Sequence, residues 1–335
     1  VFKKIIGDLY SKAMFFHCAN HRLNLVINDT NAVIEIRNTV GTIKEIIKFF
    51  RDSTLRRNMV PNIPLLCETR WSAKHKAIRI FKLNFIEIMN GLEKLTTSMN
   101  CQTRQKAHHL YVAATSSNFV VALHIIAMYS SILEPVTNQL QETQLNLQSL
   151  NEKIGDLVKI LNCHRENSEE EFATIFQEIQ TCCNLLNIDL KLPRLVKRMT
   201  HKSNQPAHSV EEYYRRSIFI SYLDSIITSL NERFSENHKI PFALLQLHLR
   251  EMKLLTKQEF IKIVSKIENF YGTSLLENFI VEATTWYETW KKKTLDPSNI
   301  EYIDLLENAK SFYPSVFQAI KIGLTLPITT CTVER

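Results

Sequence analysis

The sequence is poor in the residues that make tight turns, with six glycines and nine prolines among 335 residues. A chain of many short strands needs more of both, because they supply the backbone angles of hairpins and turns. Scarce glycine also argues against loops that cradle nucleotide phosphates, and neither a nucleophile-elbow pattern nor a dinucleotide-binding fingerprint occurs. The composition therefore favours a helical protein.

Long apolar runs and targeting signals are also missing. No uninterrupted apolar run reaches the about 18 residues that a membrane-spanning helix needs, and residues 1–10 lack a signal-peptide pattern. Seven irregularly placed cysteines form no disulfide framework, which predicts a reducing compartment. The lack of such runs and signals predicts a soluble protein with no membrane partner, and we expect no small-molecule substrate. Because residue 1 is not Met and no helix stop signal follows residue 333, we also expect the chain to be an internal piece of a longer protein.

The charge balance permits a nucleic-acid partner without proving one. The chain has 41 Lys and Arg against 34 Asp and Glu, a formal charge of +7. Spread along the sequence, this excess is diffuse and does not form a dedicated basic arm. With 45% hydrophobic and 22% charged residues, the chain can bury an ordinary globular core.

Apolar residues recur at helical spacing along most of the chain. The pattern predicts helical stretches at residues 21–50, 71–92, 118–140, 147–161, 172–186, 209–234, 241–252, 256–271, 273–293, 300–309 and 316–326. A short apolar run at residues 13–16 is strand-like. Residues 191–202 carry five Lys or Arg and no acid, and turn residues follow them, so they are predicted to form an exposed basic loop.

Four separated sequence patches indicate the class of protein more specifically than the composition does. They are HCANHRLNL at residues 17–25, ETRWS at residues 68–72, EYYRRSIFI at residues 212–220 and LTLPITTCTVER at residues 324–335. In this order they resemble the hAT superfamily of DNA transposases, most closely the branch that includes zinc finger MYM-type protein 1-like proteins. The first matches the family's HCxxHxLNL signature, the second its TRW motif, and the last the opening of its C-terminal dimerisation region.

The resemblance implies a mainly α chain in which a large helical domain interrupts a ribonuclease-H-like α/β core. Residues 1–36 are expected to be part of that core, as a strand, turn and helix around the HCxxH motif. Residues 37–319 are expected to form the all-helical insertion domain. Residues 320–335 would return to the core and begin the dimerisation region. The resemblance also implies a nuclear protein that associates with DNA and with copies of itself.

In hAT enzymes, three acidic residues hold two divalent metal ions for DNA cleavage and transfer. Carboxylate oxygens suit Mg²⁺, and two cations can activate the attacking oxygen and stabilise the leaving one. By resemblance, Glu334 is the third of these acids, catalytic and metal-binding in an intact parent. The two aspartates belong upstream of the HCxxH motif, and Asp8 lies in a helical context that does not match. We therefore expect no enzyme activity and no bound cofactor in this chain alone, with Mg²⁺ bound by intact family members.

The Cys18 and His21 pair has three readings. It could be half of a zinc site, but zinc needs about four ligands and no second pair lies at suitable spacing. The resemblance places the pair at the turn beside the metal centre, where His21 would contact a DNA phosphate and Cys18 would pack behind it. The plainer reading is a buried polar pair that fixes the turn.

Arg70 and Trp71 are the second candidate pair. An arbitrary tryptophan at the start of a helix is by default a core anchor. By resemblance, Trp71 would instead stack on an extruded base, with Arg70 near the phosphates.

Two further basic or aromatic stretches have less specific readings. Lys197 and Arg198, in the predicted basic loop, could contact DNA phosphates, although a solvated loop is commoner. The run at residues 213–216 is predicted to serve in packing and salt bridges rather than in base recognition.

Three hypotheses on function follow. The first is a transposase-derived nuclear protein whose helical domain supports DNA association and self-association, while this chain is itself inactive. The second is that the chain is the middle of an active transposase. The third is a helical protein-interaction scaffold without DNA contact. Two aspartates upstream of Val1 would separate the first two hypotheses, and salt-dependent DNA binding would test the third.

Overall fold

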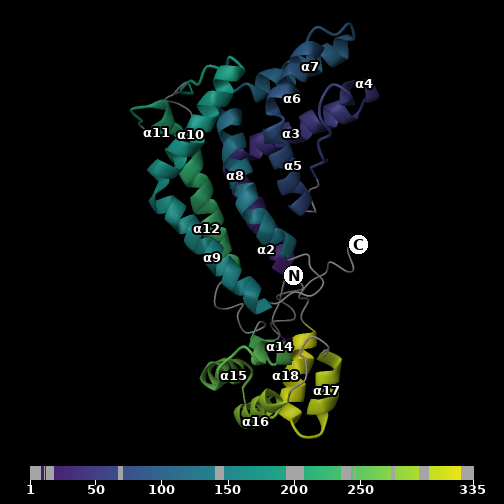
Figure 1. Ribbon diagram of the computed structural model, residues 1–335, viewed down its shortest axis with the longest axis vertical. Coiled ribbons are helices and arrows are strands. Elements are labelled where there is room, and N and C mark those ends of the chain that lie inside the picture. The colour runs from purple at the N-terminus through teal and green to yellow at the C-terminus, as the bar shows by residue number, and fades with distance from the viewer. Residues whose placement is uncertain are drawn as a thin grey trace. The chain divides into compact units, whose positions relative to one another are not determined.

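The structure is a computed structural model (Figure 1) that describes residues 9–10, 12, 19–66, 71–139, 147–193, 207–234, 243–244, 246–272, 276–293 and 302–325. Within these ranges the chain is mostly helical and contains no strand, which confirms the mainly α class. The strand-like run at residues 13–16 lies outside them. The ribonuclease-H-like remnants and the boundaries at residues 36 and 319 stay predictions.

The chain divides into two compact units. We call Leu23–Gln139 with Gly155–Leu230 the first unit, and Val1–Arg22, Leu140–Ile154 and Asn231–Arg335 the second unit. The first unit holds all or most of α2 (Ala19–Asp29), η1 (Thr30–Ala32), α3 (Ile34–Arg51), α4 (Thr54–Arg57), α5 (Trp71–Leu83), α6 (Phe85–Leu95), α7 (Cys101–Ala114), α8 (Ser117–Gln139), α9 (Leu147–Glu166), α10 (Ser168–Leu185), α11 (Val210–Tyr214), η2 (Arg215–Ile220) and α12 (Ser221–Arg233).

Helix α8 is the central element of the first unit and packs against α3, α5, α7, α10 and η2 (Figure 1). By length and mean hydropathy its Ser117–Asn138 stretch could cross a membrane, although the sequence shows no uninterrupted apolar run of that length. In the fold, 72% of this window is buried inside the protein. Burial of α8 on several sides accounts for its apolar composition, since a helix surrounded by others is apolar all round.

Aromatic side chains join α8 to α10 and η2. The ring of Phe219 lies 6.1 Å from that of Tyr129 and 5.2 Å from that of Phe172, measured between centroids. The helix predicted at residues 209–234 begins as expected, because the Ser209 hydroxyl caps it by accepting the Glu212 N–H at 3.0 Å. It is not uniform, since η2 is a π-helical segment between α11 and α12.

Two local features of the first unit differ from the sequence pattern. The stretch predicted at residues 71–92 is two helices, which meet at Asn84, and the Asn84 amide donates to the Ile80 carbonyl at 2.8 Å. Helix α7 was not predicted at all. Helix α6 also approaches its neighbours so closely at Gly91 that a Cβ there would lie 2.9 Å from a Val60 methyl group.

The second unit contains α14 (Leu249–Met252), α15 (Lys257–Tyr271), α16 (Phe279–Lys292), α17 (Tyr302–Lys310) and α18 (Pro314–Leu324), which share a continuous apolar core. Helix α15 starts as predicted, because Thr256 and Glu259 form a capping box. Within the stretch predicted at residues 241–252, the described residues comprise helical positions 243–244, a turn at 246–247 and helix α14. The stretch predicted from residue 273 forms α16 only after Asn278, whose φ is 57°.

A carboxylate from α16 fixes the start of α18. Glu282 accepts the backbone N–H of Ser315 at 2.7 Å, and the Ser315 hydroxyl donates to the Glu277 carbonyl. The first N–H groups of a helix have no partner within the helix, so an acceptor there satisfies them. The Glu282 side chain on α16 therefore caps α18, which begins 32 residues later in the chain.

Candidate nucleic-acid interface

The structure describes the side chain of no residue proposed as a site from the sequence. His21 lies in the first turn of α2 and Trp71 is the first residue of α5, but only their backbones are described. Cys18, Arg70, Lys197, Arg198 and Glu334 lie outside the described residues. Their proposed contacts with DNA or metal therefore stay predictions.

Helix α5, which follows the TRW motif, contains four Lys or Arg and no acid, and two of these cations are paired with acids of neighbouring helices. Arg79 forms an ion pair with Glu134 of α8, and the Lys82 ammonium lies 2.7 Å from a carboxylate oxygen of Glu178 on α10. Lys74 is buried. Three of the four basic residues of α5 are thus buried or paired within the protein, and Lys76 is exposed.

Burial strongly affects His75 on the same helix. The side chain is 2% exposed. Removal from water, with the nearby charges of Lys74 and Arg79, lowers the pKa of His75 from 6.5 to about 3. Burial also lowers the pKa of His124 on α8. Both imidazoles are therefore neutral in the folded protein at neutral pH.

The low pKa of His75 predicts acid sensitivity of the first unit. Between its unfolded pKa near 6.5 and its folded pKa, the unfolded state binds more protons, so stability is full above pH 6.5 and falls as the pH decreases. From pH 7 to about pH 5, this group alone should cost about 2 kcal/mol of unfolding free energy. Urea unfolding of the unchanged chain and of His75→Gln at both pH values measures the difference. Equal losses in the two proteins would contradict the prediction.

Residues 213–216 have the packing role expected from the sequence. Tyr213 and Tyr214 are buried, and the Tyr214 hydroxyl donates to the Lys191 carbonyl at 2.8 Å. Arg215 forms an ion pair with Glu169, and Arg216 forms one with Glu212 at 2.7 Å. These side chains are occupied within the protein, which confirms the prediction.

A polar groove between α3, α4 and α7 is the best candidate for an anion-binding surface. Its volume is about 550 Å³, and we call it the α3/α4/α7 groove. It is lined by Glu45, Lys48, Phe49, Asp52, Arg56, Asn100, Gln102, Thr103 and Lys106. Asn100 positions one wall, because its side-chain oxygen caps α7 by accepting the Thr103 N–H at 2.9 Å.

Two of the three cations in the groove have no carboxylate partner among the described residues. Arg56 stacks its guanidinium on Phe49, 4.2 Å from the ring centroid, and its buried Nε has no hydrogen-bond acceptor there. Lys48 is exposed and forms no ion pair in the described part of the chain. The ammonium of the third cation, Lys106, lies 2.5 Å from a carboxylate oxygen of Glu45 across the groove. Stacked arginine and free lysine are groups that bind phosphate well.

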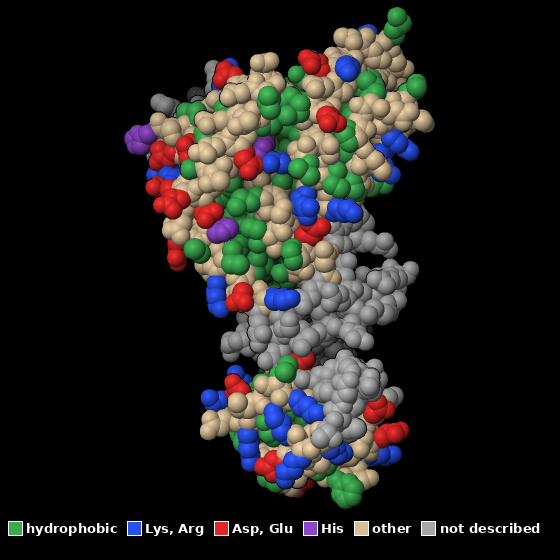
Figure 2. Space-filling model, in the orientation of Figure 1, with side chains coloured by type: hydrophobic (Ala, Val, Ile, Leu, Met, Phe, Trp, Pro, Cys, Tyr) green, Lys and Arg blue, Asp and Glu red, His purple; other side chains and the backbone are tan. Residues whose placement is uncertain are grey.

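The walls of the groove concentrate positive charge. Residues 34–57 and 101–114 contain eight Lys or Arg against three Asp or Glu, an excess of five in a chain whose total is +7. The guanidiniums of Arg51, Arg57 and Arg104 donate to backbone carbonyls, which leaves their charge uncancelled. Figure 2 shows Lys and Arg side chains gathered at the edge of the molecule beside α4. Charge that is diffuse along the sequence is thus collected in space.

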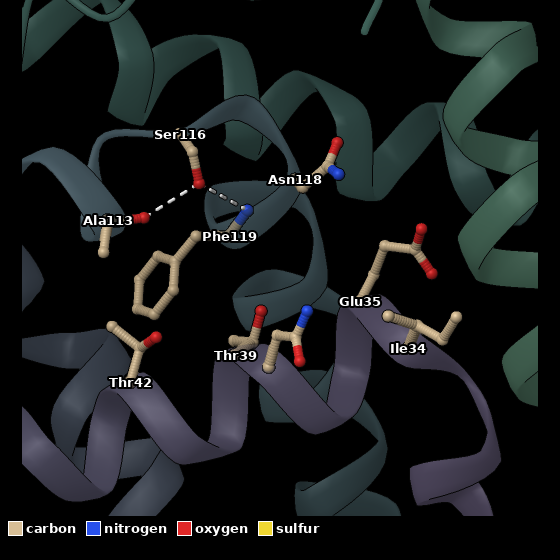
Figure 3. Close-up of a pocket in the computed structure, with 9 residues that line it drawn as sticks. Ile34, Glu35, Thr39, Thr42, Ala113, Ser116, Asn118 and Phe119 are labelled. Carbon is tan, nitrogen blue, oxygen red and sulfur yellow. Dashed lines mark hydrogen bonds between the residues drawn. The ribbon is translucent and has the colours of Figure 1, made fainter. Parts of the chain in front are cut away.

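A second pocket, at the other end of α3, has a different character (Figure 3). Its volume is about 350 Å³, and it lies between the start of α3, the end of α7 and the start of α8. Of its nine lining residues, Glu35 is the charged one. The Ser116 hydroxyl near its rim is used locally, because it donates to the Ala113 carbonyl at 2.8 Å. A lone carboxylate repels phosphate, so this pocket does not extend the anion-binding surface.

Sequence reasoning missed the groove although a signal was present. Lys44, Lys48 and Arg51 are spaced by four and three residues, which places them on neighbouring positions of one helix surface. No acid occurs at residues 96–114. The relation between these two basic stretches is set by tertiary packing of α3 on α7.

The described residues hold no group of three or more His, Cys, Asp or Glu that could bind a metal ion. Cys101, Cys163, Cys182 and Cys183 are free thiols. The residues expected to contact a metal or its surroundings, Glu334, Cys18 and His21, are those whose side chains are not described.

Comparison with known proteins gives a distant similarity along the whole chain. The human protein named 52 kDa repressor of the inhibitor of the protein kinase is 22% identical over 359 aligned residues, which cover 98% of this chain and 46% of the relative. The mouse protein of the same name is 23% identical over 356 residues, with the same coverage. The chain thus spans less than half the length of these relatives. No protein-family model and no solved structure matches it.

Proposed function

We propose that this chain is part of a nuclear protein derived from a hAT transposase, and that it associates with DNA and with copies of itself. The observation that carries the proposal is the similarity to the 52 kDa repressor over 98% of the chain. The four motif patches, present in family order, resemble the same class of protein. Because the relatives are named as a repressor, a role in regulation is favoured over catalysis.

The α3/α4/α7 groove supports the DNA-binding part of the proposal. Its unpaired Lys48 and stacked Arg56 suit phosphates of the DNA backbone, and contacts of this kind do not depend on sequence. Arg70, Trp71, His21, Lys197 and Arg198 stay proposed as further DNA contacts.

The ends of the chain are proposed to be remnants of a ribonuclease-H-like core, with self-association through residues 320–335. Glu334 would bind Mg²⁺ only in a parent protein that also has the two upstream aspartates. An active transposase is the alternative, and it needs those aspartates in the parent sequence.

Duplex DNA binding across a salt series tests the proposal. The unchanged chain is titrated onto a fluorescent duplex of arbitrary sequence, and anisotropy gives the dissociation constant at each salt concentration. If three groove cations contact phosphates, log K should fall with log salt at a slope of about −3, and affinity should drop about 40-fold between about 50 and 200 mM salt.

Two outcomes would count against DNA association. No binding at low salt would favour the third hypothesis, a helical scaffold that contacts only proteins. Binding without salt dependence would contradict phosphate contacts, because released counterions impose that dependence.

A further inference from the structure

Thr54 lies at the edge of the α3/α4/α7 groove with an exposed side chain. It is the first residue of α4, between the groove residues Asp52 and Arg56. The next residue, Leu55, is 83% exposed. Nothing in the described part of the first unit covers this turn, so a partner enzyme can approach it from solvent.

The backbone around Thr54 needs little rearrangement to enter an enzyme cleft. Ser53 is already extended, with φ −143° and ψ 132°, and its side chain does not cap the helix. Helix α4 is one turn of four residues, and no side chain in it is buried. Short, exposed turns open at low free-energy cost, since few contacts are lost.

Arginines surround Thr54 in sequence and in space. Arg51 precedes it by three residues, and Arg56 and Arg57 follow it by two and three. The side chain of Arg57 reaches back across the turn and donates to the Arg51 carbonyl at 2.7 Å. Protein kinases select substrates by charge pattern, and an acidic substrate cleft favours a hydroxyl flanked by arginines.

From these observations we infer that Thr54 is a phosphorylation site for an arginine-directed protein kinase, and that its modification weakens DNA binding in the groove. The second part rests on the proposed function. In the reaction, the Thr54 hydroxyl oxygen bonds to the γ-phosphorus of ATP. The bond from that phosphorus to the β–γ bridging oxygen breaks, ADP leaves, and the hydroxyl proton passes to the catalytic base of the kinase.

The charge of the product explains the effect on the groove. A phosphothreonine adds about two negative charges near neutral pH and accepts charge-assisted hydrogen bonds from guanidiniums. The excess of five positive charges at residues 34–57 and 101–114 would fall to about three. The new phosphate can also pair with Arg56, two residues further along the same turn, and so compete with DNA for a groove cation.

The experiment treats the whole chain with ATP and the purified catalytic domain of an arginine-directed serine/threonine kinase. Mass spectrometry of the folded protein should locate one phosphate on Thr54. In the duplex titration, the modified protein should show a salt slope about 2 shallower and a dissociation constant about 50-fold higher at about 0.1 M salt. Thr54→Glu should give part of this change and Thr54→Gln none. Gln177→Glu on α10 adds the same charge away from the groove and should bind like the unchanged chain.

Failure of this inference is distinguishable from failure of DNA association. A phosphate on Ser53 alone, or none on either residue, overturns the modification site whatever the DNA result. Phosphorylated Thr54 with unchanged duplex affinity overturns the regulatory effect. If the unmodified chain does not bind DNA at all, the proposed function and the regulatory effect both fail, while the mass spectrum still decides the site.

Discussion

Replacing Lys48, Arg56 and Lys106 together by alanine is expected to weaken duplex DNA binding about 100-fold at about 0.1 M salt. Each cation that contacts a phosphate releases about 0.9 of a counterion, so the loss of three contacts should make the salt slope shallower by about 2.7. Lys106 already faces Glu45 at 2.5 Å, so it is expected to contribute less than Lys48 or Arg56. Fluorescence anisotropy with an arbitrary duplex measures both quantities.

A matched variant separates groove binding from loss of total charge. Lys262, Lys266 and Lys310 are exposed lysines on α15 and α17, and their replacement by alanine removes the same three charges. This control should keep the salt slope of the unchanged chain. Equal weakening in both triple variants would show that affinity follows net charge, and the α3/α4/α7 groove would lose its assigned role.

The variant Trp286→Ala is expected to destabilise the second unit by about 4 kcal/mol. Trp286 is 1% exposed, donates from its indole N–H to the Leu247 carbonyl at 3.3 Å, and packs against the rings of Trp290 and Tyr313. Its removal leaves a large cavity and an unpaired carbonyl, and both terms lower stability. The loss should therefore exceed that of an ordinary core leucine.

Hydrogen exchange of backbone amides gives a local readout for this variant. Peptides from α15, α16 and α18 should lose protection in Trp286→Ala, because these helices share one core. Phe312→Ala removes an aromatic side chain that is 80% exposed and should change protection little. Protection that is unchanged in Trp286→Ala would contradict the assignment of this tryptophan to the core.

The sequence predicted helices best where apolar residues recur strongly. Helix α8 and the helix that starts at Ser209 were found because their apolar positions and cap are local signals. Helix α7 was missed because its buried positions, Ala107, Leu110 and Ala114, are few and mostly small. The break at Asn84 was missed because Phe81 and Phe85 keep a helical spacing across it.

The candidate site was less predictable than the fold, for a physical reason. The motif-based residues were chosen by resemblance, and their side chains lie outside what the structure describes. The groove depends on the packing of α3 against α7, which brings Lys48 and Lys106 together although they are 58 positions apart. A scan along the chain records only an average charge, whereas an anion responds to charges that are close in space.

The contact between Glu282 and the first turn of α18 has a consequence for how this protein can diverge. Because the Glu282 carboxylate on α16 holds the first turn of α18, the length of the chain between the two helices does not by itself determine where α18 begins. Insertions and deletions are then tolerated at residues 293–301, before α17, whose Leu305 and Ala309 belong to the same core, provided the acid and a free N–H at the start of α18 are kept. Among relatives, segment length in this stretch should therefore vary more freely than the identity of residue 282.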